Sequence, residues 1–122
     1  MTLVEASLTD AERRALQRFV GLLEDRLGPR LRSVWLYGSR ARGEPPHPES
    51  DIDVLVVADP VHPDDDLAAI DVAWQALDEE RVTGTRISTR FYDPERLARR
   101  REIQSFFIQE VDRDKIVLSG EP

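Results

Sequence analysis

Apolar residues near the start of the chain recur with the spacing of one helix face. They are Leu16, Phe19, Val20, Leu23 and Leu27, and this period of about 3.6 residues predicts an amphipathic helix. Thr9 and Glu12 precede this run with the spacing of a capping box. Gly28 and Pro29 follow it and end the helix. The pattern therefore predicts one helix between a Thr9 cap and Gly28.

Apolar runs with strand spacing follow, separated by helical stretches. We expect strands at 34–37, 52–57, 86–92 and 115–120, and helices at 62–80 and from 94 to about 111, with a short helix near 40–43. The run at 52–57 is almost continuously aliphatic, which indicates a strand buried on both faces. This order of elements predicts a single α/β domain over residues 1–122, in which helices flank a mixed sheet of about four strands.

Composition and charge narrow the function classes. The chain contains no cysteine, which excludes disulfides, thiolate zinc sites and a cysteine nucleophile. No apolar run approaches the roughly 20 residues that span a bilayer, and the N-terminus lacks the order of a signal peptide. We therefore expect a cytoplasmic protein without membrane contact. The net charge of −7 argues against a long nucleic acid as partner, because phosphate binding needs a basic face.

Two short motifs carry the candidate chemistry. Gly38 and Ser39 end the strand at 34–37, and Asp51 and Asp53 begin the strand at 52–57. Residues two apart on a strand share a face, so both carboxylates point the same way. If the two strands are antiparallel neighbours, the connection at 40–50 brings the Gly-Ser turn against the carboxylates. Glycine lets a phosphate approach closely, and Mg²⁺ is typically held by one or two carboxylates together with substrate phosphates.

The joint pattern resembles a known family. The stretch "LYGSRARGEPPHPESDIDVLVV", residues 36–57, resembles the signature of the minimal nucleotidyltransferases of the polymerase-β nucleotidyltransferase superfamily. The resemblance implies the polymerase-β-like nucleotidyltransferase fold and Mg²⁺-ATP as substrate. Gly38 and Ser39 would bind the phosphates, and Asp51 and Asp53 would be the catalytic metal ligands.

The resemblance also suggests a role for two arginines. Arg40 and Arg42 match arginines common in this version of the motif and are candidates for contact with the triphosphate. We favour Arg40 if only one of them touches phosphate. The alternative interpretation of both residues is a solvated turn of helix.

One position departs from the family pattern. Active members of the superfamily usually carry a third carboxylate on a later strand, where this chain has Ser88. Ser88, Arg90 and Tyr92 share one face of the strand at 86–92, and neither face carries an acid. We expect the missing ligand to weaken metal binding and base catalysis.

The family suggests a partner. Minimal nucleotidyltransferases often pair with a HEPN-domain ribonuclease toxin, which they neutralise by transferring AMP to a tyrosine or by binding alone. The resemblance thus implies an antitoxin in a homo- or hetero-oligomer. One alternative is a free-standing transferase that acts on a small hydroxylated molecule. Another is a catalytically inactive module that binds a nucleotide or a partner.

The remaining features have simpler interpretations. His47 and His62 lack partners at ligand spacing, so we expect no metal at either. Trp35 and Trp74 are predicted to be core or interface aromatics. Of the three bulky residues at 106–108, at least one should be exposed.

The arginine-rich run at 95–102 leaves two interpretations open. It is either a solvated helix face on which Glu95 and Glu102 pair with arginines, or a docking surface for an acidic protein.

Overall fold

The computed structural model describes residues 2–45 and 51–122. Its elements are α1 (Asp10–Leu27), the 3₁₀ helix η1 (Gly28–Arg30), β1 (Leu31–Tyr37), α2 (Gly38–Ala41), β2 (Ile52–Ala58), α3 (Asp65–Glu79), β3 (Ile87–Tyr92), α4 (Pro94–Glu102), α5 (Phe106–Asp114) and β4 (Ile116–Gly120). Within these ranges the strands form a four-stranded sheet with the order β3-β2-β1-β4. The predicted α/β class with a mixed sheet is confirmed. No helix in the described part of the chain is long and apolar enough to cross a membrane.

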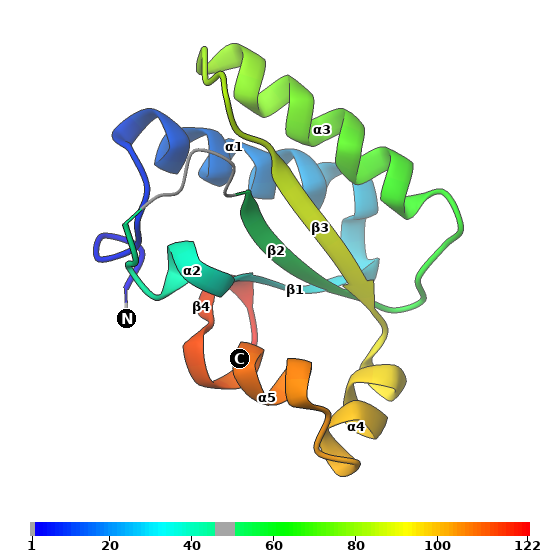
Figure 1. Cartoon of the computed structure of the whole chain (residues 1–122). Coiled ribbons are helices and arrows are strands. Elements are labelled where there is room, and N and C mark those ends of the chain that lie inside the picture. Colours follow the sequence, from blue (N-terminus) through cyan, green and yellow to red (C-terminus); the bar gives the residue numbers. More distant parts are fainter. Residues whose placement is uncertain (1, 46–50) are drawn as a thin grey trace.

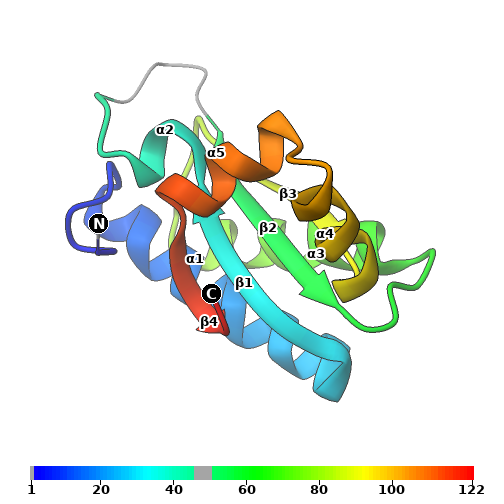
Figure 2. The same ribbon diagram turned by 90° about the horizontal axis from the view of Figure 1, so that it is seen from below.

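The sheet topology places the two motifs together. β1 pairs antiparallel with β2 and with β4, whereas β2 pairs parallel with β3. The parallel pair is joined through α3, which lies on the same face of the sheet as α1, while α4 and α5 cover the opposite face (Figures 1 and 2). The first two strands are antiparallel neighbours, which was the condition for the two motifs to meet, so the end of β1 and the start of β2 lie at the same end of the sheet.

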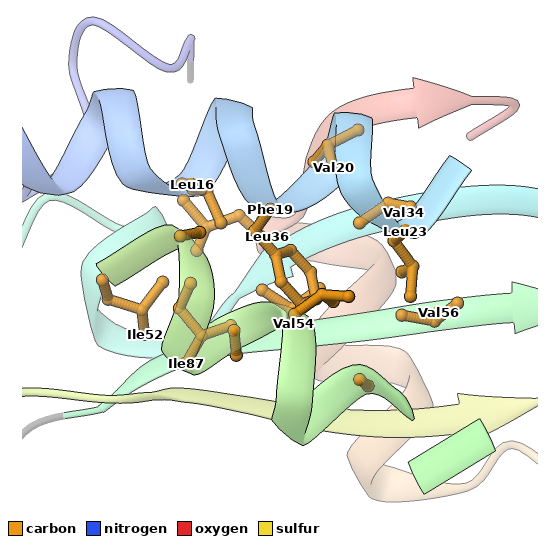
Figure 3. Close-up of a cluster of buried hydrophobic side chains, with 14 of the residues drawn as sticks. Leu16, Phe19, Val20, Leu23, Val34, Leu36, Ile52, Val54, Val56 and Ile87 are labelled. Atoms are coloured by element: carbon orange, nitrogen blue, oxygen red, sulfur yellow. The ribbon is translucent and has the colours of Figure 1, made fainter. Parts of the chain in front are cut away.

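The larger core lies between the sheet and the helices α1 and α3. Figure 3 shows the apolar face of α1 pointing toward the aliphatic residues of β1 and β2, and the labelled side chains are Leu16, Phe19, Val20, Leu23, Val34, Leu36, Ile52, Val54, Val56 and Ile87. Each is buried, and burying one such side chain stabilises the fold by about 1.5–3 kcal/mol. The near-continuous aliphatic run in β2 follows from its position, because helices cover both of its faces.

The predicted capping box at the start of α1 is confirmed. The backbone N–H of Glu12 donates to Thr9 Oγ1 at 3.0 Å, and the backbone N–H of Thr9 donates to Glu12 Oε1 at 2.8 Å. These bonds satisfy two of the N–H groups that a helix start leaves unpaired. At the other end, α1 stops at Leu27, and Gly28 takes a positive φ of 60°. Local sequence therefore sets both ends of this helix.

The helix predicted from 94 to about 111 is instead two helices. α4 ends at Glu102 and α5 begins at Phe106, with Gln104 at a positive φ of 55° between them. The break redirects the chain so that Ile108 and Val111 of α5 join a second apolar cluster on the sheet. Helical periodicity continues across the junction in the sequence, and only this packing reveals the turn.

The predictions for the aromatic residues have different outcomes. Trp35 is buried as expected, and Phe106 is exposed, which confirms that at least one residue of 106–108 faces solvent. Trp74 is 58% exposed and is therefore not a core residue. The buried apolar residues of α3 are instead small residues and one leucine, namely Ala69, Val72, Ala73, Ala76 and Leu77. Because α3 lies close to the sheet, these small side chains make the contact and the larger ones face outward.

The arginine-rich helix α4 keeps most of its cations engaged. Arg99 pairs with Glu95 at 2.7 Å, and Arg101 pairs with Asp112 of α5 at 2.8 Å. Arg96 lies over the Tyr92 ring at 4.2 Å. The Glu95 pairing confirms one of the predicted intrahelical partners. The four arginines are exposed, and a docking surface for an acidic protein stays a prediction.

Candidate nucleotide and metal site

The Gly38 turn is built around the carboxylate of Asp53. Gly38 follows β1 directly and has a φ of +79°, a conformation that side-chain-bearing residues adopt at a cost. A Cβ atom placed on Gly38 would lie 2.7 Å from Asp53 Oδ2. The backbone angle therefore favours glycine here, and any side chain at this position would displace the Asp53 carboxylate. The two sequence motifs meet as predicted.

Three strands contribute one row of side chains to the site. Tyr37 of β1 lies opposite Asp53 of β2, and Asp53 lies beside Ser88 of β3. Residues in register on neighbouring strands share a face and lie roughly 5 Å apart. Ser88 of β3 therefore lies beside Asp53.

The two aspartates differ in their electrostatic surroundings. Burial raises the pKa of Asp53, the nearby charge of Asp51 raises it further, and the cations Arg90 and Arg40 oppose this rise without cancelling it. Asp51 has a side chain that is 28% exposed, and it pairs with Arg86 Nε at 3.0 Å. Asp53 thus carries a negative charge that its protein surroundings only partly compensate. A bound cation would supply the missing compensation.

Arg90 is a site residue that sequence reasoning did not assign. Its guanidinium carbon lies 4.7 Å from the centroid of the Phe107 ring, and the same ring packs edge-on against Tyr37 at 5.5 Å. Burial and the charge of Asp53 raise the pKa of Tyr37. The charge of Arg90 and its hydrogen bond oppose this rise only in part. The alternation in 86–92 already put Arg90 on the Ser88 face. Its neighbour Phe107 comes from α5, which local sequence could not place.

The two candidate phosphate arginines have different environments. Arg40 is only 4% exposed, and its Nη1 donates to Glu12 Oε1 and to the carbonyl of Ser7, each at 3.0 Å. A solvated turn of helix is therefore the wrong interpretation of Arg40. Its guanidinium joins α2 to α1, although its charge also acts on Asp53.

Arg42 is the more accessible of the two arginines. It forms exposed ion pairs with Glu44 at 3.1 Å and with Asp114 at 3.5 Å. It also lines a small cavity of about 110 Å³ beside Gly38 and Phe107. The solvated interpretation therefore fits Arg42 better than Arg40, and its position beside Gly38 keeps it within the candidate site.

The donor set of the site suits a hard cation that is shared with a ligand. Asp51 and Asp53 offer carboxylate oxygens, the donors that Mg²⁺ prefers. Among the described residues, no group of three or more His, Cys, Asp and Glu side chains could hold a metal ion. A cation at this site would therefore depend on ligand oxygens, such as those of a phosphate chain. Of the two histidines, His47 lies outside the described residues, and the backbone N–H of His62 donates to Asp65.

Comparisons with known proteins agree with this geometry. The model of the family described as "Nucleotidyltransferase domain" matches residues 16–112. A protein of Methanocaldococcus jannaschii, provisionally named a protein adenylyltransferase, is 42% identical over 48 residues. That match covers 39% of this chain and 47% of the relative, so it spans about half of the relative's length.

Two solved structures share the fold. One is a mutant of the toxin–antitoxin pair MntA–HpeT, with 17% identity, and the other is a toxin–antitoxin structure with AMP-PNP, with 20% identity. Each has a TM-score of 0.52, and each alignment covers 86% of this chain and 73% of the other. The family match runs from α1 into α5 and includes Gly38, Ser39, Asp51 and Asp53. The superfamily resemblance of residues 36–57 is thus confirmed, and the chain belongs to the nucleotidyltransferase domain family.

Proposed function

We propose that this chain binds Mg²⁺-ATP and acts as the antitoxin of a HEPN-domain ribonuclease, either by transferring AMP to a tyrosine of the toxin or by direct binding. In this proposal Asp51 and Asp53 hold Mg²⁺, and Gly38 and Ser39 hold the phosphates. The observation that carries the proposal is the approach of Asp53 Oδ2 to within 2.7 Å of the Cβ position of Gly38. It puts metal-binding oxygens and a phosphate-binding turn at one place.

The proposed reaction is attack by the tyrosine hydroxyl on the α-phosphorus of ATP. The phenolic oxygen forms the new bond to phosphorus, the bond from phosphorus to the bridging oxygen breaks, pyrophosphate leaves, and the phenolic proton passes to water. Bound Mg²⁺ would neutralise charge on the phosphates. The protein contributes position and orientation. Because Ser88 stands beside Asp53, β3 supplies no carboxylate there to accept the proton, and we expect slow transfer.

The comparisons support the acceptor and partner classes. The relative from Methanocaldococcus jannaschii carries the provisional name of a protein adenylyltransferase, which agrees with a protein acceptor. The structural neighbours come from toxin–antitoxin structures, one of which contains AMP-PNP. Those assignments belong to the other proteins. For this chain they favour the antitoxin proposal over the free-standing transferase.

The test uses a HEPN-domain protein as acceptor and ATP labelled at the α-phosphate. We expect label on that protein with the wild-type chain and Mg²⁺, and none with Asp53→Asn. Asp59→Asn is the matched control, because Asp59 directly follows the other end of β2 and is exposed. If the wild-type chain neither labels nor binds the HEPN-domain protein, the proposal is wrong.

Ser88 favours a second candidate function, a module that binds a nucleotide without transferring AMP. Calorimetry together with the labelling assay distinguishes this module from the AMP-transferring antitoxin. Binding of Mg²⁺-ATP that Asp53→Asn abolishes, without label on any acceptor, supports the binding module. Turnover of a small hydroxylated acceptor without a protein partner would instead support the free-standing transferase.

A further inference from the structure

A stripe of large apolar residues on α3 faces solvent. It consists of Leu67, Ile70 and Trp74, which are 69%, 49% and 58% exposed. These residues lie at intervals of three and four, so they share one face of the helix. Monomeric proteins rarely expose contiguous apolar surface of this kind without a binding role. We call these three residues the α3 stripe.

A groove separates the α3 stripe from the neighbouring strand β3. Two adjoining hollows of about 440 and 570 Å³ form it, and both are lined by Trp74, Leu77 and Arg86. The first hollow also reaches Ile70 of the stripe and the β3 residues Ser88 and Thr89. Figure 1 shows α3 and β3 running alongside each other at this side of the molecule. We call this space the α3/β3 groove.

The β3 side of the groove is a sheet edge. β3 is an outermost strand of the sheet that the described residues form. The carbonyl of Arg86, the residue before β3, accepts a hydrogen bond from the backbone N–H of Ile52 at 2.9 Å. The backbone groups of Arg86 therefore point toward β2. Because the direction of backbone groups alternates along a strand, those of Ile87 and Thr89 face the edge. Backbone groups at a sheet edge can pair with an added strand.

The groove runs directly into the candidate site. Asp51 lines the second hollow and Ser88, the neighbour of Asp53, lines the first. Between Asp66 and Asp78, which line opposite ends of the groove, α3 rises by roughly 18 Å. That length is several times the size of a nucleobase but matches about five or six residues of extended chain. The shape therefore favours a polypeptide over the base of the nucleotide.

The charges at the ends of the groove indicate the chemistry of the occupant. Among the residues that the structure describes, neither Asp66 nor Asp78 has an ion-pair partner. Other acids of the helix are paired, such as Asp71 with Arg26. An extended segment with apolar residues in its centre and basic residues at its ends would complement both features.

We propose that the α3/β3 groove binds an extended, basic-ended segment of the acceptor protein along the edge of β3, with the hydroxyl residue to be modified beside Asp51. This inference rests on the proposed function, because it takes the acceptor to be a protein. It assigns the α3 stripe to acceptor binding and leaves nucleotide binding to the Gly38 turn and the aspartates.

Trp74 provides a direct reporter for the test. The chain has two tryptophans, of which Trp35 is buried and Trp74 lies in the groove. The probes are two synthetic peptides, acetyl-KVYVTVK-amide and the same peptide with both lysines replaced by glutamate. We expect the lysine peptide to give a saturable blue shift of tryptophan emission and to bind at least about tenfold more tightly than the glutamate peptide.

Three variants show where the lysine peptide binds. Ile70→Ser should weaken binding by removing apolar contact, and Thr89→Pro should weaken it by removing an edge-facing N–H, a change that edge strands tolerate. Phe106→Ser is the matched control, because Phe106 is an exposed aromatic on α5, outside the groove. It should bind the peptide like the wild-type chain.

The results separate this inference from the proposed function. Calorimetry with Mg²⁺-ATP measures the nucleotide site independently, and Ile70→Ser should retain the wild-type affinity there. Absence of a shift with both peptides overturns the groove assignment, even if Mg²⁺-ATP binds. A blue shift that appears with rising protein concentration and without peptide also overturns it, because a second copy of the chain would then occupy the groove.

Discussion

Two charged groups contact the short helix α2, namely the Arg40–Glu12 pair and the carboxylate of Asp53. They differ in how far their charge is compensated within the protein. Arg40 of α2 is buried against Glu12 of α1, where hydrogen bonds satisfy both partners. Burial alone would raise the pKa of Glu12, but hydrogen bonds from Thr9 and the contact with Arg40 outweigh it and lower that pKa. Asp53, whose carboxylate lies against Gly38 at the start of α2, has a raised pKa.

We infer from this contrast that Glu12 has a structural role and Asp53 a functional one. A carboxylate with a lowered pKa stabilises the folded state, whereas one with a raised pKa destabilises it in its ionised form. Glu12 already has its cation within the protein. The negative charge of Asp53 is only partly compensated by nearby cations, as expected of a carboxylate that binds a metal ion.

The largest expected effect comes from breaking the compensated pair. Arg40→Met should lower the free energy of unfolding by about 3–5 kcal/mol, because it leaves the Glu12 carboxylate without its cation. The double variant Glu12→Gln/Arg40→Met should recover most of that loss, as measured by urea unfolding. If Arg40→Met instead keeps its stability and loses Mg²⁺-ATP affinity, Arg40 is primarily a phosphate ligand.

A methyl group on Gly38 should disturb the uncompensated site. Gly38→Ala combines a strained backbone, about 1–3 kcal/mol, with a Cβ placed 2.7 Å from Asp53 Oδ2. Gly84→Ala is the control, because Gly84 has nearly the same φ, +80°, and open space around its Cβ position. Both variants should lose stability. Only Gly38→Ala should weaken Mg²⁺-ATP binding, by at least about tenfold in calorimetry.

Removing the uncompensated charge should stabilise the protein. Asp53→Asn should raise the free energy of unfolding of the nucleotide-free chain by about 0.5–2 kcal/mol while it abolishes Mg²⁺-ATP binding, a trade-off typical of functional sites. Asp51→Asn should change stability by less than about 1 kcal/mol, because Asp51 is partly exposed and already pairs with Arg86. Thermal unfolding of both variants checks this, and a less stable Asp53→Asn would contradict the assignment.

The smallest effect concerns the pH dependence of stability. The folded-state pKa of Glu12 is lowered, so its contribution is complete above its unfolded pKa of about 4.3 and is lost as pH falls through the folded value. We expect Glu12→Gln to lose less stability than the wild-type chain between pH 7 and pH 3, by under about 2 kcal/mol. Urea unfolding across this range measures the difference, and parallel curves for the two proteins would contradict it.

Local sequence was sufficient to predict the parts of the molecule that depend on residues close together in the chain. The capping box of α1 and the glycine turn after β1 involve residues only a few positions apart, so their spacing is sufficient to predict them. The alternation of β2 and β3 predicted which side chains share a face, including Ser88 with Arg90. The role predicted for the motif at 36–57 requires its two ends to meet, and the antiparallel pairing of β1 and β2 meets that condition.

The contacts of groups far apart in the chain depend on how the helices and strands pack. Glu12 is 28 residues from Arg40, and Phe107 reaches Arg90 and Tyr37 from a helix whose start the sequence pattern hid. The sequence predicted a helix at 62–80 but not which of its faces would be buried. Close packing against the sheet selected the small residues for the interior and left Leu67, Ile70 and Trp74 in solvent. Such outcomes depend on the distances between elements, and no local pattern contains those distances.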